Sequence, residues 1–219
     1  MDSKKYKLVL FDLDGTLLDT LEDLRAAVNH ALGKRCLPLH DREAIRVRVG
    51  HGVRNLIKRS LPEDFNADEA YVDSCLADFR SFYTANIDVA TVPYPGMPEL
   101  LAELDREGVR LAVVSNKFQE GTERLIREFF PEVRFAAILG NREGHPLKPD
   151  PAIIGEALAL AGVAPSEAVM VGDSPTDMLT ASNAGIDAIA VTWGYRPAES
   201  LAGHRLAGSV PELRQAIPG

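Results

Sequence analysis

The chain has 219 residues, a formal net charge of −8, 46% hydrophobic residues and 26% charged residues. These values are typical of a globular protein with one large or two modest domains, and they argue against a disordered chain. Affinity for nucleic acid depends on clustered lysine and arginine, so the negative charge argues against a general nucleic-acid binder. An anionic substrate would need local positive charge.

The sequence indicates a cytoplasmic protein without a membrane partner. The apolar run behind Lys4, Lys5 and Lys7 has only four residues before Asp12, against roughly 7–15 in the core of a signal peptide. No apolar stretch approaches the ~20 residues of a membrane-spanning helix. The two cysteines lack the spacing of metal ligands, and two cysteines in a chain of this size are typical of free thiols.

The first predicted element is a buried strand that ends in two carboxylates. Residues 8–11, Leu-Val-Leu-Phe, form a short apolar run that is typical of a strand in a parallel sheet. Asp12 and Asp14 follow at its carboxyl end, which is where open α/β sheets bind ligands. Two like charges at this position are unfavourable unless they share a cation or protons. The pair therefore predicts a metal.

An all-helical segment is predicted after this strand. Apolar residues recur at the spacings of three and four that an amphipathic helix requires, at Leu21, Leu24, Val28 and Leu32. This helix is expected to end at Gly33. Further helices are predicted over residues 41–49, 53–60 and 67–83. No convincing strand is visible between residues 17 and 90, which indicates a small helical bundle.

Helices then alternate with short apolar strands. Strands are predicted over residues 110–115, 136–140, 168–172 and 187–191, with helices over 97–107, 121–130, 151–161, 176–184 and 211–216. Such alternation indicates βαβ units and a parallel sheet. A short N-terminal strand has little to pack on unless it joins this sheet. We therefore expect an α/β core formed by residues 1–18 and 90–219, with an inserted all-helical domain over residues 19–89.

Polar side chains also follow the later strands, where they would supply carboxylates for a cation, a lysine for an anion and hydrogen-bond donors: Ser115, Asn116 and Lys117; Lys148; Asp173 and Asp177. A strand-end aspartate is often only a helix cap, and a loop lysine often only a solvated charge. Four carboxylates near one another, however, need a cation.

This ordered set of segments resembles the haloacid dehalogenase-like hydrolase superfamily. The matching segments are residues 12–20 (DLDGTLLDT), 115–117 (SNK), 148–149 (KP) and 172–177 (GDSPTD). The helical insert is similar to the cap that follows the first motif in many members, so the resemblance covers nearly the whole chain. It implies a Rossmann-like parallel sheet core with an inserted all-helical cap domain.

The resemblance implies a phosphatase that works through an aspartyl-phosphate. Asp12 would be the nucleophile, and Asp14 would be the general acid and base. Lys148 would neutralise Asp12 and the phosphoryl oxygens, while Ser115 and the amide of Asn116 would donate hydrogen bonds to those oxygens. Asp14 also separates this interpretation from dehalogenation, because dehalogenases of the superfamily lack the second aspartate.

Mg²⁺ is the expected cofactor because it prefers hard oxygen ligands and commonly binds one or two carboxylates. Asp12 and Asp173 are the expected side-chain ligands. The family pattern adds the backbone carbonyl of Asp14 and leaves Asp177 to hold a coordinated water or to orient Lys148. Lys117 is expected to point to solvent, because its side chain is long.

Residues 49–53, Val-Gly-His-Gly-Val, are similar to a cap-loop pattern in phosphoglycolate phosphatase-like members. This loop would carry His51 and Arg54 toward the non-phosphoryl end of the substrate, where Arg54 would pair with a carboxylate. The competing interpretation is a solvated basic helix face. The expected substrate is a small phosphorylated metabolite, with 2-phosphoglycolate as the candidate.

Two alternatives stay open. A phosphomutase of the β-phosphoglucomutase type would pass the phosphoryl group from the aspartate back to a sugar phosphate, with the same core residues. A non-enzymatic phosphoacceptor of the receiver type also gathers acidic residues, a hydroxyl and a lysine around Mg²⁺. That type fits less well, because Ser115 stands where a receiver would have its acceptor aspartate and because the helical insert is foreign to it. The sequence does not indicate an oligomeric state.

Overall fold

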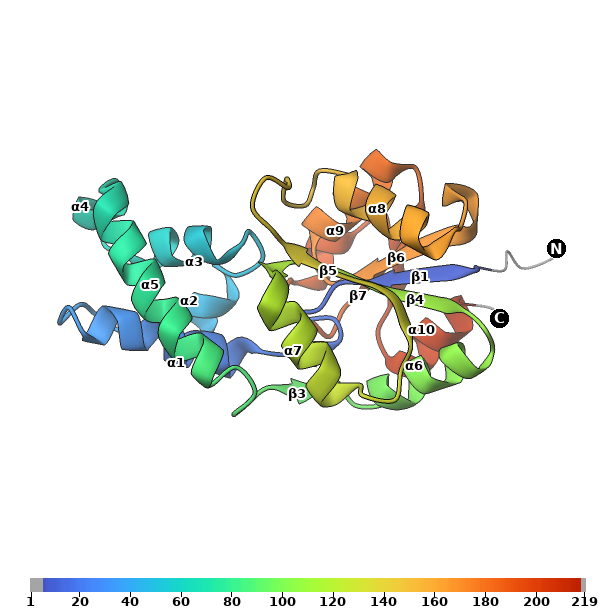
Figure 1. Ribbon diagram of the computed structural model, residues 1–219, viewed down its shortest axis with the longest axis horizontal. Helices are drawn as coiled ribbons and strands as arrows, with labels where there is room; N and C mark the ends of the chain where they lie inside the picture. The colour runs from blue at the N-terminus through green and yellow to red at the C-terminus, as the bar shows by residue number, and fades with distance from the viewer. Residues whose placement is uncertain (1–5, 218–219) are drawn as a thin grey trace.

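The computed structural model describes residues 6–217, and its centre is a six-stranded parallel sheet with the strand order β5-β4-β1-β6-β7-β8 (Figure 1). The strands are β1 (Leu8–Phe11), β4 (Arg110–Phe118), β5 (Phe135–Asn141), β6 (Ala168–Gly172), β7 (Asp187–Val191) and β8 (Arg205–Ala207). The predicted α/β fold with a parallel sheet is confirmed. The edge strand β8 was not predicted, because three residues without a marked apolar run give little signal.

Strand β1 lies in the middle of the sheet, and all of its residues are buried. Val9 and Phe11 belong to the apolar cluster on one face, whereas Leu8 and Leu10 belong to the cluster on the other face. A strand that is covered on both faces needs a continuous apolar run, which explains the sequence of β1.

Helices cover both faces of the sheet (Figure 1). One face is covered by α8 (Ala152–Ala161) and α9 (Pro175–Ala184), and the other by α6 (Met97–Arg106), α7 (Gln119–Phe129) and α10 (Val210–Ala216). Two short 3₁₀ helices lie in the connections: η1 (Pro165–Glu167) comes directly before β6, and η2 (Ala198–Leu201) lies between β7 and β8. These helices cover the two faces of the sheet but not the ends of its strands.

A helical segment lies to one side of the sheet (Figure 1). It consists of α1 (Leu21–Gly33), α2 (Arg42–Arg46), α3 (Val53–Ser60), α4 (Glu63–Asn66) and α5 (Glu69–Ala85). The connections on either side of it pair as two-residue antiparallel strands, β2 (Leu18–Asp19) and β3 (Val92–Pro93). These strands were not predicted, because two residues carry no periodicity. The paired connections keep the two ends of the segment together.

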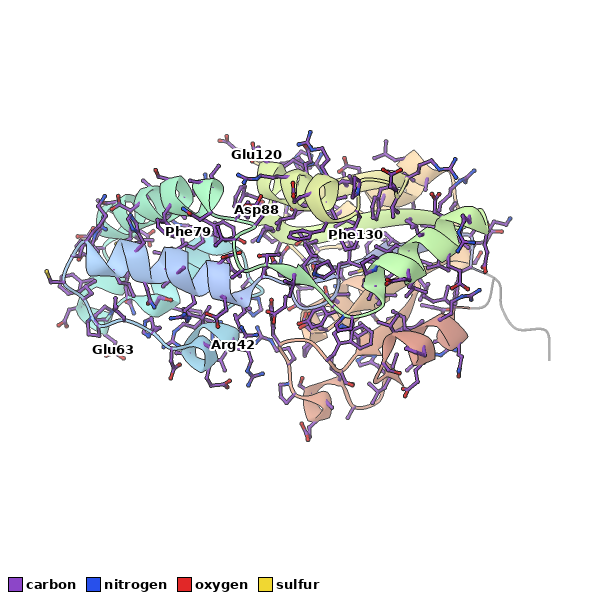
Figure 2. All side chains as sticks on the ribbon, turned by 90° about the horizontal axis from the view of Figure 1, so that it is seen from below. Arg42, Glu63, Phe79, Asp88, Glu120 and Phe130 are labelled. Carbon is purple, nitrogen blue, oxygen red and sulfur yellow. The ribbon has the colours of Figure 1, made fainter. Side chains whose placement is uncertain are left out.

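Buried contacts join the helical segment to the rest of the chain. Phe79 lies inside the segment (Figure 2), and its cluster of buried apolar side chains continues to Phe11 of β1. The buried carboxylate of Asp23 accepts hydrogen bonds from the backbone N–H groups of Ala90, at 3.0 Å, and Thr91, at 2.8 Å. This carboxylate therefore fastens the returning connection to the first turn of α1. The division into domains over residues 1–18 with 90–219 and over 19–89 stays a prediction.

Over residues 6–217, the structure contains no helix that combines the length and the apolar character needed to cross a membrane.

Candidate active site

A cavity of about 60 Å³ lies between the carboxyl ends of the strands and the helical segment. Strand β1 pairs with both β4 and β6, so the residues that follow these three strands meet at one edge. The cavity brings together the predicted site residues Asp12, Asp14, Ser115, Asn116, Lys148, Asp173 and Asp177. Apolar residues of the helical segment, among them Leu24, Leu56 and Phe79, also line its wall.

Lys148 bridges two carboxylates of the cavity. Its ammonium donates hydrogen bonds to Oδ1 of Asp12 at 2.8 Å, to Oδ1 of Asp177 at 2.7 Å and to the carbonyl of Val114 at 3.0 Å. Burial disfavours the charge, but Asp12 and Asp177 outweigh burial and raise the pKa of Lys148. The lysine is therefore a fixed positive charge beside Asp12.

Three buried carboxylates form a cluster suited to a cation. Asp12, Asp173 and Asp177 each offer one oxygen, and these oxygens lie within 4.8 Å of one another. Burial raises the pKa of Asp12 to about 7, with Lys148 opposing the shift and Asp177 adding to it. Burial and repulsion from Asp177 and Asp12 raise the pKa of Asp173 to about 8. One lysine does not balance three carboxylates, and an all-oxygen donor set fits a hard divalent cation.

Two glycines enclose Asp173. A Cβ atom on Gly194 would lie 2.3 Å from Cβ of Asp173, and one on Gly15 would lie 2.5 Å from its Oδ2. The backbone N–H of Tyr195 donates a hydrogen bond to the same Oδ2 at 2.6 Å. Gly194 and Tyr195 were not predicted as site residues, because the only signal in the sequence of this loop is a glycine that follows a strand.

The start of α9 orients Asp177. Ser174 caps the helix by accepting a hydrogen bond from the backbone N–H of Asp177, and Pro175 occupies the first turn. Oδ2 of Asp177 accepts hydrogen bonds from the backbone N–H of Ser174 at 3.1 Å and from its hydroxyl at 2.6 Å. Oδ1 is then left to accept from Lys148. The capping box of α9 thus orients Asp177 toward Lys148.

A bulge in β4 moves residues 115–117 toward the cavity. Between two pairings with β5, β4 advances from residue 114 to 118 while β5 advances only from 139 to 141. Ser115, buried in this bulge, lines the cavity. The amide of Asn116 donates to the carbonyls of Gly50, at 3.1 Å, and Lys148, at 3.2 Å. Asn116 therefore links the end of β4 to the loop that contains Lys148 and to the helical segment.

The same bulge carries Lys117 into the cavity. The ammonium of Lys117 donates to Oδ1 of Asp14 at 3.0 Å and to the hydroxyl of Tyr83 at 2.6 Å. Asp14 also accepts from the hydroxyl of Thr20 at 2.6 Å. Lys117 is buried, so the expectation that it points to solvent is wrong. Its long side chain points inward to Tyr83 of α5, and no local sequence pattern indicates this contact.

The loop before α3 reaches the cavity through Gly50, Gly52 and Val53. The side chains of His51 and Arg54 are not among the described residues that line it. His51 is exposed, and Arg54 forms ion pairs with Asp73 and Glu69 of α5. Successive residues of a helix point about 100° apart. When Val53 faces the cavity, Arg54 faces α5 instead.

Known proteins resemble this chain in both sequence and fold. The sequence profile of the family described as haloacid dehalogenase-like hydrolase matches residues 9–191. The phosphoglycolate phosphatase of Mesorhizobium japonicum is 40% identical over 189 residues, which cover 86% of this chain and 83% of the relative.

Two solved structures share the fold over almost the whole chain. A crystal structure from Lactobacillus delbrueckii subsp. bulgaricus has a TM-score of 0.91 and 32% identity, and it covers 98% of this chain and 99% of its own. That of a predicted phosphoglycolate phosphatase from Haemophilus somnus has a TM-score of 0.87 and 28% identity, with coverage of 97% and 98%. The chain belongs to the haloacid dehalogenase-like hydrolase family, as a phosphoglycolate phosphatase-like member.

Proposed function

We propose that the protein is a Mg²⁺-dependent phosphatase that hydrolyses a small phosphomonoester through an aspartyl-phosphate, with 2-phosphoglycolate as the candidate substrate. The observation that carries this proposal is the arrangement of Asp12, which is paired with the charged Lys148 on one oxygen and shares its cavity with Asp14. The relatives named phosphoglycolate phosphatase support the choice of substrate.

Asp12 would act as the nucleophile. Its Oδ1 accepts a hydrogen bond from Lys148, which leaves Oδ2 to attack phosphorus. The bond from Oδ2 to phosphorus would form as the bond from phosphorus to the ester oxygen breaks, so that one difficult displacement becomes two easier ones. Lys148 would hold the attacking carboxylate in place and offset the negative charge that gathers on the phosphoryl group.

Asp14 would act as the general acid and then as the general base. It would give a proton to the departing ester oxygen and later take one from the water that attacks the aspartyl-phosphate. Thr20 and Lys117 both donate to its Oδ1, which fixes its orientation. Ser115 and the backbone N–H of Asn116 would donate hydrogen bonds to the phosphoryl oxygens.

The acidic cluster would hold Mg²⁺ through Asp12 and Asp173, with the backbone carbonyl of Asp14 and with Asp177 in support. When bound, the ion would supply positive charge to the phosphoryl oxygens. The helical segment would act as a cap, because its apolar side chains cover the cavity and exclude bulk water. His51 and Arg54 would then lie outside the contact with the substrate.

The relatives favour hydrolysis over the phosphomutase alternative, because curated proteins that are 35% and 40% identical to this chain are named phosphoglycolate phosphatase.

A screen of phosphomonoesters tests the proposed function. Phosphate release from 2-phosphoglycolate, small sugar phosphates and p-nitrophenyl phosphate would be compared by kcat/KM with and without Mg²⁺. The expected result is phosphate release that depends on Mg²⁺, with the highest kcat/KM for 2-phosphoglycolate. Isomerisation of hexose 1-phosphates without phosphate release would contradict it.

A further inference from the structure

The cavity holds a positive charge that the proposed chemistry at phosphorus does not use. Among the described residues, three cationic side chains line the cavity: Lys117, Lys148 and Arg196. Lys148 donates all three of its N–H groups to protein oxygens. Arg196 donates to the backbone carbonyls of Arg46 and Val49, so its guanidinium is directed to the helical segment.

Lys117 differs from both Lys148 and Arg196, because one of its N–H donors has no hydrogen-bond acceptor among the described residues. Among the described residues its ammonium has two hydrogen-bond acceptors, Oδ1 of Asp14 at 3.0 Å and the hydroxyl of Tyr83 at 2.6 Å. An ammonium has three donors, so one has no hydrogen-bond acceptor among the described residues, although the ammonium also lies over the ring of Tyr83, 4.6 Å from its centroid. The Lys117 side chain is only 3% exposed, and a buried charge needs every partner it can have.

In the proposed reaction, the contact of Lys117 with Asp14 would place this donor beside the leaving group. The ammonium is hydrogen-bonded to Asp14, the residue proposed to protonate the departing ester oxygen. Phosphoryl oxygens would lie on the other side of that ester oxygen, with Asp12 and Lys148. The cavity wall includes the apolar side chains of Leu24 and Phe79, which would face the leaving group. An ionised group on the leaving group would be costly against such a wall unless a cation met it.

We propose that Lys117 determines specificity by binding a carboxylate on the leaving group, one carbon atom away from the ester oxygen. The spacing follows from the geometry, because the proton donor and the cation are themselves joined by a contact of 3.0 Å. A substrate with one carbon between ester oxygen and carboxylate reaches both groups, and 2-phosphoglycolate has this spacing. The inference rests on the proposed phosphatase function and assigns the carboxylate to Lys117 rather than Arg54.

The experiment compares ligands that differ only in the carboxylate. The substrates are 2-phosphoglycolate and ethyl phosphate, and the non-hydrolysable pair is 3-phosphonopropionate and propylphosphonate. For the two substrates, the measured quantity is the ratio of their kcat/KM values. For the two phosphonates, it is the ratio of their Kd values, from calorimetry with Mg²⁺. Both ratios are measured for the wild type, Lys117→Gln and Arg54→Met. Glutamine keeps a hydrogen-bond donor and removes the charge, while Arg54→Met removes the cation that pairs with α5.

The wild type is expected to prefer the carboxylated member of each pair by at least about tenfold, as a charge-assisted hydrogen bond allows. Lys117→Gln is expected to lose most of that preference in both ratios, and Arg54→Met is expected to keep it. A wild type that binds the two phosphonates equally well would overturn the inference without any variant. A preference that disappears with Arg54→Met and persists with Lys117→Gln would also overturn it.

Failure of the proposed function is separate from failure of this inference. If the wild type releases no phosphate from any monoester, the proposed function fails. If it releases phosphate but the carboxylate makes no difference, the phosphatase stands and the role of Lys117 is refuted.

Discussion

The ammonium of Lys148 lies 2.8 Å from Oδ1 of Asp12, and both side chains are buried at the edge of the sheet. The same ammonium reaches Asp177, so one lysine stabilises two members of a cluster of three carboxylates. Its charge is the protein's own contribution to balancing a site that is otherwise strongly negative.

Replacing Lys148 with methionine is expected to abolish most phosphatase activity and to destabilise the fold. Removing one partner of a buried ion pair leaves charge unbalanced and costs about 3–5 kcal/mol. Urea unfolding of the metal-free protein measures the loss. The matched control is Lys58→Met, because Lys58 forms a surface ion pair with Glu69, and its loss is expected to stay within about 0.5 kcal/mol. Equal stability of the two variants would contradict the role given to Lys148.

The metal-free protein is expected to lose stability as the pH rises. Asp12 and Asp173 have raised pKa values, about 7 and about 8, so the folded state keeps their protons when the unfolded chain has released them. Their contribution is fully present below the ordinary carboxylate pKa of about 4 and is lost as pH rises through the folded values. The melting temperature in a chelator is therefore expected to fall between about pH 5 and pH 8.

Mg²⁺ is expected to raise the melting temperature more at high pH than at low pH, because it binds the deprotonated carboxylates. The variant Asp173→Asn is expected to reduce both the decline without metal and the gain with metal. A metal-free melting curve that does not change over this pH range would contradict the charge balance described for the cluster.

Adding a methyl group at Gly194 is expected to remove activity by displacing Asp173. A Cβ atom there would lie 2.3 Å from Cβ of Asp173 and 2.4 Å from the carbonyl oxygen of Gly15. Gly194→Ala is therefore expected to weaken Mg²⁺ binding, measured by calorimetry, together with kcat. The control is Gly155→Ala in α8, where a Cβ atom meets nothing within 4 Å and helix propensity favours alanine by roughly 1 kcal/mol. Wild-type affinity for Mg²⁺ in Gly194→Ala would refute the steric argument.

Replacing Asp23 with alanine is expected to loosen the connection between the helical segment and the sheet. Its buried carboxylate accepts from two backbone N–H groups and from the hydroxyl of Thr91. Leaving such donors without a partner costs about 1–3 kcal/mol. Hydrogen exchange at Ala90 and Thr91 is expected to rise more than exchange in β1. Unchanged exchange at these two residues would show that Asp23 does not hold the connection.

The sequence was sufficient to predict part of the group of residues at the edge of the sheet, but not the presence of Lys117 and Tyr195 there. Asp12, Ser115 and Asp173 each follow an apolar run, and the ends of neighbouring parallel strands meet at one edge. Their contacts depend on more than this pattern. The bulge that directs Lys117 inward arises from the pairing of β4 with β5, and its partner Tyr83 comes from α5. Neither relation leaves a local signal.

The loop before α3 shows the same limit within a single helical turn. Its glycines placed it near the cavity, but the sequence did not show which face of α3 the cavity would meet. Packing against α5 decides that Val53 faces inward and that Arg54 pairs with Asp73. A shift of one residue along a helix is thus enough to exchange a candidate ligand for a surface ion pair.

The most direct test of the central claim is the rate of phosphate release by Asp12→Asn with Mg²⁺ present. Asparagine keeps the shape of the side chain but removes the nucleophilic carboxylate. The kcat of Asp12→Asn is expected to fall by at least about 10³-fold on every phosphomonoester that the wild type hydrolyses, with a melting curve that still shows a folded protein. Turnover by Asp12→Asn at the wild-type rate would contradict the assignment of Asp12 as the nucleophile.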